Sequence, residues 1–151
     1  MVDKAIKKVE TGVSVVTTKL GNKLNGLAVA WLSRVSMQPP MIMVSIGKTR
    51  FSHDLIKKSR IFAVNVLGKN HIEIGRHFGL QSGRKADKFK DIEYETRQTG
   101  APILKECIAY LDCNVVNECD AGDHTIFVGE VVDGEVLSDE EPVIYSKGDF
   151  Y

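Results

Sequence analysis

The sequence lacks both an excess of one charge and a long apolar run. Its 20 basic and 20 acidic residues give a formal net charge of +0, so no overall field attracts nucleic acid or an anionic membrane surface. No apolar stretch approaches the length of a membrane span, and no apolar region follows Met1 as in a secretion signal. We therefore expect neither a nucleic-acid nor a membrane partner, and a cytoplasmic location.

Cysteine is scarce and unpaired in pattern. Cys107, Cys113 and Cys119 are an odd number at spacings of six, which fits neither a disulfide framework nor the close pairs of structural zinc sites. An even spacing would place all three on one face if residues 106–118 formed one unbroken strand. Buried, reduced thiols are favoured over a metal site.

Residue patterns for hydrolysis, metal binding and dinucleotide binding are also missing. The sequence has no recognisable catalytic triad, carboxylate dyad or Gly-rich dinucleotide fingerprint. His71 and His77 are six apart, which is not the spacing that pairs side chains on one helix face. We expect no metal.

The chain length and pattern indicate one strand-rich domain. At 151 residues it can bury a core without disulfides but is short for two domains, so we expect one domain over residues 1–151. A helical rhythm marks residues 2–9. Runs rich in β-branched residues predict strands at 11–18, 27–32, 41–46, 61–67, 109–116, 125–132 and 142–145. Seven strands are enough for a closed sheet, which would have no exposed edge.

The most informative stretch is residues 25–53, NGLAVAWLSRVSMQPPMIMVSIGKTRFSH. Pro39 and Pro40 cannot continue a sheet ladder, so a chain reversal is expected at residues 36–40. The run 41–46 is apolar except for Ser45 and predicts a buried strand. A helix-like segment follows at 52–59, with Leu55 and Ile56 on its apolar face.

Polar and cationic side chains gather between that strand and that helix. Within seven positions the sequence places Gly47, Lys48, Thr49, Arg50, Ser52 and His53. Free amides at a helix start, hydroxyls and an Arg fork suit a phosphate group. The alternative is a polar turn in which Ser52 caps the helix. Trp31 likewise has two interpretations, a buried core residue or a platform for an aromatic ring.

The stretch between Gly68 and Gly100 is polar and charged. It contains one helical piece around residues 71–78 and then the basic loop SGRKADKFKD. We interpret it as a surface excursion that covers the site, because loops on a rigid barrel often carry function. The alternative is a solvated loop with no such role.

Several segments resemble the flavin reductase-like proteins of the FMN-binding split-barrel superfamily. They are TGVSVVTT, NGLAVAWLSRVSMQPPMIMVSIGKTRFSHDLI, IFAVNVL, GDHTIFVGEV and PVIYSKGDFY, in this order over nearly the whole chain. The resemblance implies a mainly β fold, an antiparallel split β-barrel of Greek-key type with a few short flanking helices. It also implies FMN as cofactor and a homodimer.

The same resemblance implies the site residues. The cofactor-binding positions carried over are Asn25, Ala28, Val29, Ala30, Trp31, Ser33, Ser45, Ile46, Arg50, Ser52 and His53. His124, in the triplet Gly122-Asp123-His124, is the candidate catalytic contact to the nicotinamide or substrate. Its alternative role is a polar residue in a hairpin turn at 120–124.

Two departures from the family pattern bear on function. Many flavin reductases carry Thr-Ala-Asn-Ser where this chain has Ala28 to Trp31, and family members often have Ser at the position of Arg50. The first change looks more like flavoredoxin and the flavin domains that pass electrons to rubredoxin. The Arg fork of Arg50 favours a tightly held FMN over a flavin that exchanges freely as substrate. The missing triad agrees with a flavin enzyme, because the cofactor supplies the reactive atoms.

Two functions remain open on these grounds. One is a flavoprotein oxidoreductase that transfers electrons from NADH or NADPH through FMN to a flavin or protein acceptor. The other is a flavoredoxin-type carrier reduced by a protein partner such as rubredoxin or ferredoxin. A third, less specific interpretation is a flavin-binding barrel without turnover. Nothing in the sequence distinguishes NADH from NADPH or names the final acceptor.

Overall fold

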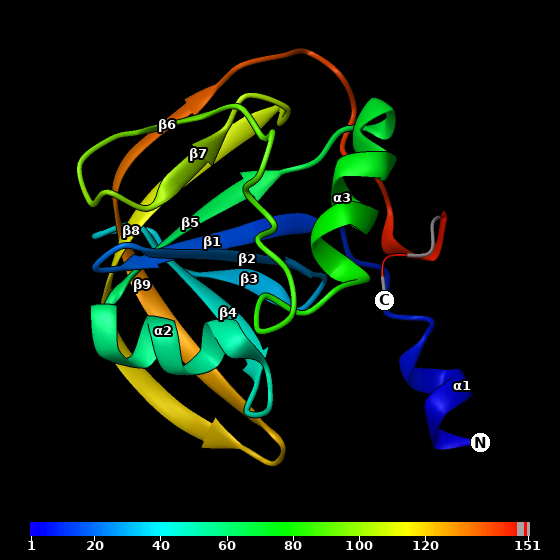
Figure 1. The fold of residues 1–151 in the computed structure, drawn as a ribbon. Helices are drawn as coiled ribbons and strands as arrows, with labels where there is room; N and C mark the ends of the chain where they lie inside the picture. The colour runs from blue at the N-terminus through cyan, green and yellow to red at the C-terminus, as the bar shows by residue number, and fades with distance from the viewer. Residues whose placement is uncertain (148–149, 151) are drawn as a thin grey trace.

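The computed structural model describes residues 1–147 and Phe150. One seven-stranded antiparallel sheet forms most of the fold, in the spatial order β2-β1-β5-β8-β9-β4-β3 (Figure 1). Its strands are β1 Ser14–Leu20, β2 Lys23–Val29, β3 Leu32–Ser36, β4 Met41–Gly47, β5 Ile61–Val66, β8 Ala109–Ala121 and β9 His124–Val136. Two short strands, β6 Tyr94–Thr96 and β7 Pro102–Leu104, pair separately. The expected mainly antiparallel β fold is confirmed.

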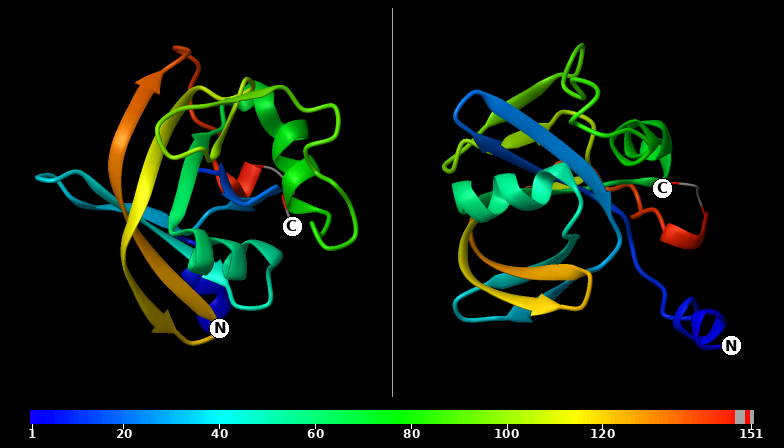
Figure 2. Two further views of the ribbon diagram at one scale, coloured as in Figure 1. Left: turned by 60° about the vertical axis from the view of Figure 1, so that its left-hand side comes forward. Right: turned by 60° about the horizontal axis from the view of Figure 1, so that its bottom comes forward.

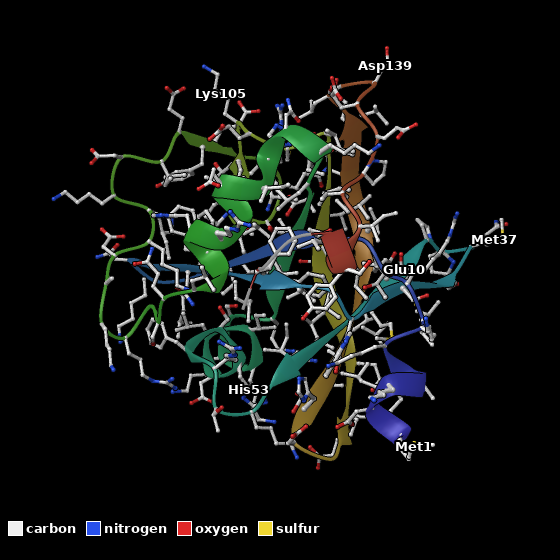
Figure 3. All side chains as sticks on the ribbon, turned by 90° about the vertical axis from the view of Figure 1, so that its right-hand side faces the viewer. Met1, Glu10, Met37, His53, Lys105 and Asp139 are labelled. Carbon is white, nitrogen blue, oxygen red and sulfur yellow. The ribbon has the colours of Figure 1, made fainter. Side chains whose placement is uncertain are left out.

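Tight turns make sequential strands into neighbours. Gly21 and Gly122 have φ values of 60° and 64°, a left-handed conformation that glycine adopts without strain. They join β1 to β2 and β8 to β9. The reversal predicted at residues 36–40 is also present, and it joins β3 to β4 with Met37 at the outer end of the hairpin (Figure 3).

The sheet curves around a core without closing through hydrogen bonds (Figure 2). β2 and β3 are consecutive in the chain but lie at opposite edges of the strand order. Only Ala30 and Trp31 separate them. The carbonyl oxygen of Trp31 accepts a hydrogen bond at 2.9 Å from the amide of Ser45 on β4, the strand that pairs with β3. Across the described residues no ladder joins the two edges, so the closed sheet expected from the strand number is wrong.

Three α-helices flank the sheet, α1 Val2–Ile6, α2 Phe51–Ser59 and α3 Ile72–Gly79, with short 3₁₀ segments η1 Lys69–His71 and η2 Tyr145–Lys147. α2 packs against β1 and β2 and buries Leu55 and Ile56, as its sequence pattern predicts. α1 stands apart from the sheet and buries none of its residues (Figure 1). None of the helices in the described residues is long and apolar enough to cross a membrane.

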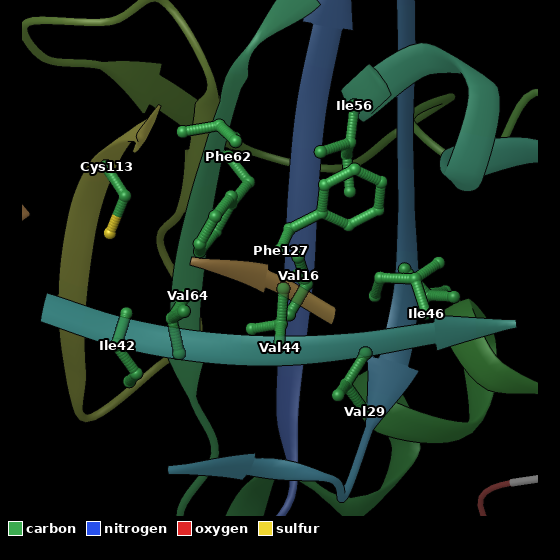
Figure 4. Close-up of a cluster of buried hydrophobic side chains, with 12 residues drawn as sticks. Val16, Val29, Ile42, Val44, Ile46, Ile56, Phe62, Val64, Cys113 and Phe127 are labelled. Atoms are coloured by element: carbon green, nitrogen blue, oxygen red, sulfur yellow. The ribbon is translucent and has the colours of Figure 1, made fainter. Parts of the chain in front are cut away.

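The main apolar core fills the space enclosed by the curved sheet and α2. Val16, Val44, Phe62 and Phe127 are fully buried there, with the two aromatic rings at its centre (Figure 4). Burial of such side chains stabilises the fold by roughly 1.5–3 kcal/mol each. A second cluster lies under α3 and includes Phe78 and Phe150. Together the two cores hold β2 between them and fix the strand from which the site is built.

The three cysteines do not share one face. Cys107 and Cys113 are buried free thiols, whereas Cys119 is exposed. Burial raises the pKa of Cys107 to about 11 and that of Cys113 to about 12. The condition for a common face, one unbroken strand over residues 106–118, is not met. Cys107 precedes β8, and register shifts at 112/113 and 115/117 interrupt the alternation of side chains within it.

The strand expected at residues 142–145 is also wrong. Pro142 and Ile144 form isolated bridges to two different segments, at Gly68 and Gly12. Tyr145 then begins η2. A proline cannot donate to a ladder, and a segment wedged between two neighbours makes single bonds to each instead of a continuous pairing.

Candidate functional site

Two adjoining cavities lie where β2 leaves the sheet edge and α2 begins. The split cavity, about 250 Å³, is lined by Leu27, Ala28, Val29, Ala30, Trp31, Ser45, Gly47, Arg50 and His124. The basic cavity, about 430 Å³, is lined by Asn25, Leu27, Arg50, Phe51 and Ser52 on one side and by residues 79–84 and Lys88 on the other. Leu27 and Arg50 line both, so the two cavities lie side by side.

The split cavity is mostly apolar and ends in an aromatic pair. The rings of Trp31 and His124 lie 4.7 Å apart between centroids, tilted by 44°. Trp31 remains 54% exposed, so its indole is a surface wall and not a core residue. The ring of His124 bonds through Nδ1 to Oδ1 of Asp123 at 2.6 Å, and this bond holds the pKa of the Asp123 carboxyl below its usual range.

The basic cavity receives the start of α2. Arg50 is the N-cap, with an extended backbone and no side-chain capping bond. The first N–H groups of a helix lack intrahelical acceptors and are suited to an anion. Ser52 lies inside the helix, so the alternative in which Ser52 caps it is wrong. The hydroxyl of Ser52 instead accepts a hydrogen bond from Nδ2 of Asn25 at 2.7 Å.

Asn25 is the polar residue of β2 that faces this cavity. It is 2% exposed, and within residues 1–147 and Phe150 its Oδ1 is the buried side-chain oxygen that lacks a hydrogen-bond partner. A buried acceptor without a partner costs about 1–3 kcal/mol. A hydroxyl or N–H of a bound ligand would satisfy it.

Lys88 supplies a buried cation that the sequence interpretation missed. It is 4% exposed, and its Nζ donates to the carbonyl oxygens of Gly26 and Phe78 at 2.8 Å each. Its own carbonyl oxygen bonds to Nε2 of His77 at 2.6 Å, which ties it to α3. Burial, and secondarily the charge of Arg50, lower the pKa of Lys88 to about 8. Two such cations close together favour an anion between them.

The loop after α3 closes the basic cavity, so this part of the polar excursion does cover the site. A Cβ added to Gly83 would lie 2.2 Å from Oδ1 of Asn25 and 2.8 Å from Cδ2 of Phe51, so the loop backbone approaches β2 and α2 closely. Arg84 donates to the carbonyl oxygen of Thr49 at 2.8 Å and stacks over Phe51 at 5.4 Å. In the sequence, the signal for these contacts is the pair Gly83-Arg84 within the basic loop.

The other predicted cofactor positions lie outside both cavities. Ser33 is exposed on β3 and donates to the carbonyl oxygen of Arg34. Ile46 is buried in the main core, so any ligand contact would come from its main chain. His53 bonds through Nε2 to Oγ1 of Thr125 at 2.7 Å and through Nδ1 to Asp54 at 3.0 Å. This pairing locks α2 to β9, and the cofactor role of these residues stays a prediction.

Residues 6–151 match the flavin reductase like domain. The chain belongs to that family. The fold is accordingly the antiparallel split barrel that the sequence resemblance implied.

Three similar proteins illustrate the range of this family. The ferric-chelate reductase (NAD(P)H) of Archaeoglobus fulgidus is 34% identical over 94% of this chain and 85% of its own length. The high molecular weight rubredoxin of Moorella thermoacetica is 34% identical over 95% of this chain, but the chain spans only 63% of that protein. The NADH:FAD oxidoreductase SgcE6 of Streptomyces globisporus, solved with NAD and FAD fragments, is 30% identical with a TM-score of 0.89, covering 99% of this chain and 89% of that one.

The residues of the site fit a flavin of this family. The split cavity offers apolar walls and an aromatic face for a planar ring system. The unpartnered oxygen of Asn25 offers an acceptor to a ribityl hydroxyl. Arg50, Lys88 and the start of α2 offer charge and N–H donors to a phosphate.

Proposed function

We propose that this chain binds FMN and transfers electrons from NAD(P)H through it to a flavin or protein acceptor. The observation that carries this proposal is the direct contact between an apolar cavity and a cation-rich one, which share Leu27 and Arg50. FMN has a matching order of groups: an apolar ring system, a polyhydroxyl chain and a phosphate. The ferric-chelate reductase (NAD(P)H) among its relatives agrees with this assignment.

In this arrangement the residues bind and orient the cofactor. Residues 28–31 and Ser45 would contact the ring, Asn25 and Ser52 would contact the ribityl chain, and Arg50 and Lys88 would contact the phosphate. A bound flavin supplies the redox chemistry, because its ring accepts a hydride and passes electrons onward. His124 lies beside Trp31, where it would contact a nicotinamide or substrate that approaches the ring.

A second candidate function is a flavoredoxin-type electron carrier. Trp31 favours it, because its half-exposed indole and the ring of His124 occupy the open side of the split cavity and leave less room for a nicotinamide. The high molecular weight rubredoxin among its relatives agrees with a redox-protein partner such as rubredoxin or ferredoxin. Electrons would then reach the flavin through a protein contact at this rim.

We also propose that the chain works as a homodimer. Exposed large apolar side chains occur on α1, which buries none of its residues, and on or next to the hairpin of β3; they are Val2, Ile6, Trp31, Val35 and Met37. Exposed apolar side chains on neighbouring segments are typical of a protein interface. Light scattering tests the proposal, and a monomer at micromolar concentration contradicts it.

The visible spectrum of the purified protein, recorded without oxygen, tests the function. We expect flavin bands after incubation with FMN, and fast bleaching on addition of NADH or NADPH. Bands that stay oxidised with both nucleotides but bleach with reduced rubredoxin or ferredoxin would select the electron carrier. A colourless protein that FMN cannot reconstitute would refute both.

A further inference from the structure

A third cavity opens on the far side of Arg84. This outer cavity, about 620 Å³, lies between the β1–β2 turn, the start of α2 and the loop that carries Gly83 to Phe89. Its volume falls in the range of about 300–1,000 Å³ that small-ligand sites occupy. Neither the FMN site proposed above nor any predicted site residue uses it.

The outer cavity adjoins the basic cavity. Phe51, Gly83 and Arg84 line both. Arg84 is fixed at this junction by its bond to the Thr49 carbonyl at 2.8 Å and by its position over the Phe51 ring. A ligand that occupied both cavities would therefore lie beside an arginine fork, the side chain best suited to a second phosphate.

Aromatic rings form the inner wall of the outer cavity. Phe89 is buried, and its ring meets that of Tyr94 edge-on at 5.4 Å between centroids. Tyr94 is 42% exposed, although it is a large aromatic residue in a short strand. A partly exposed aromatic ring that lines a cavity is suited to stacking with a nucleobase, because every base has a π-face.

Charge is distributed unevenly around the two cavities. Side chains lining them include five cations, Lys23, Arg50, Arg84, Lys85 and Lys88, and one acid, Asp87. The whole chain has a formal net charge of +0, so this local excess is a property of the site. It favours a ligand with more than one phosphate.

We propose that the outer cavity binds an adenylate group, with its phosphate at Arg84 and its base on Tyr94. The inference rests on the proposed function, because it extends the phosphate of a flavin nucleotide in the basic cavity. Two ligands carry this chemistry, the AMP half of FAD and the adenylate of NAD(P)H. The first would make the site selective for a flavin dinucleotide, and the second would make it a docking point for the electron donor.

Titration of 5′-AMP into the FMN-loaded protein tests the proposal, with backbone amide resonances as the readout. We expect saturable shifts at Tyr94 and Lys85. Tyr94→Ala weakens AMP binding about tenfold, as expected for loss of one stacked base, whereas the matched control Tyr94→Phe stays within about twofold. Lys85→Glu, a substitution at an exposed position, provides a second variant that leaves the aromatic packing intact.

The affinities of FAD and FMN and the KM for NADH then distinguish the two sources. If the adenylate belongs to FAD, Tyr94→Ala and Lys85→Glu weaken FAD and leave FMN unchanged. If it belongs to the donor, both flavins bind as before and the KM for NADH rises. The proposal would be overturned if AMP caused no saturable shifts up to about 10 mM. It would also be overturned if the variants changed neither the affinity for FAD nor the KM for NADH. FMN binding in the same samples is independent of this result, and its loss in the unsubstituted protein would refute the proposed function instead.

Discussion

Asn25 on β2 donates through Nδ2 to the hydroxyl of Ser52 in the first turn of α2, at 2.7 Å. These residues are 27 positions apart in the chain. The bond sets the spacing between the strand and the helix that together form the basic cavity, and it leaves Oδ1 of Asn25 without a partner beside that cavity.

Replacing Asn25 with Leu tests this relationship. The change leaves the Ser52 hydroxyl without its donor and removes the acceptor offered to the ligand, so we expect FMN affinity to fall by about 1–3 kcal/mol. Isothermal titration calorimetry measures it. Asn117→Ala is the control, because Asn117 is exposed and its side chain bonds only to the adjacent amide of Glu118. Equal FMN affinity in Asn25→Leu would exclude Asn25 from the site.

Replacing Arg50 with Gln removes a charge-assisted contact to the phosphate. We expect FMN to bind about 1.5–3 kcal/mol more weakly, with riboflavin, which has no phosphate, unaffected. Arg34→Gln is the matched control, since Arg34 is exposed on β3 outside both cavities. A similar loss for riboflavin would show that Arg50 acts on the ring and not on the phosphate.

The affinity for FMN is expected to decrease as the pH rises through about 8. In the folded protein burial lowers the pKa of Lys88 from 10.5 to about 8, so above that pH the free site loses a positive charge. An anion binds the protonated form better, and affinity therefore falls where the free site is deprotonated and the complex is not. Fluorescence titrations between about pH 7 and 10 measure the effect. Riboflavin is the control, and a parallel decrease for riboflavin would contradict the role of Lys88.

Replacing Gly83 with Ala would force the loop away from β2. The new Cβ would lie within 2.2 Å of Asn25 Oδ1, so a neighbouring group must move. Such overpacking costs roughly 1–3 kcal/mol, and we expect it to appear as weaker FMN binding and a lower melting temperature. Gly12→Ala provides the comparison, because its Cβ would meet only the Val143 carbonyl at an ordinary 3.6 Å. If both variants behave alike, the loop does not close the site.

The single tryptophan gives an optical test of the split cavity. Because Trp31 lines that cavity, a bound flavin ring is expected to quench its fluorescence, and Trp31→Ala is expected to alter the visible spectrum and fluorescence of the flavin. Trp31→Phe keeps an aromatic wall and is expected to preserve the flavin spectrum. A spectrum unchanged by Trp31→Ala would place the indole away from the ring.

Local patterns were sufficient to predict the elements that carry the site. The Pro-Pro reversal, the apolar run of β4 and the start of α2 follow from residues close together in the sequence. Alternation along β4 also separates Ser45, which lines the split cavity, from Ile46, which faces the core. The local pattern did not show that His53 points away from the cavities. Its side chain lies in the first turn of α2 and bonds to Thr125 on β9, 72 positions away.

Lys88 could not be found in this way. Its ammonium group donates to the carbonyl oxygen of Gly26 on β2, 62 positions earlier in the chain. No pattern near either residue indicates this contact. A lysine in a basic loop normally stays in solvent. Only the packing of α3 and β2 shows that this one is buried and directed at the cavity.

The break between β2 and β3 has a consequence for the walls of the split cavity. The two edges share no ladder in the described residues, yet Ala30 and Trp31 join them covalently, and successive Cα atoms stay about 3.8 Å apart. Both of these residues line the split cavity. The distance across the break is therefore set at this point by the chain itself and not by hydrogen bonds between strands.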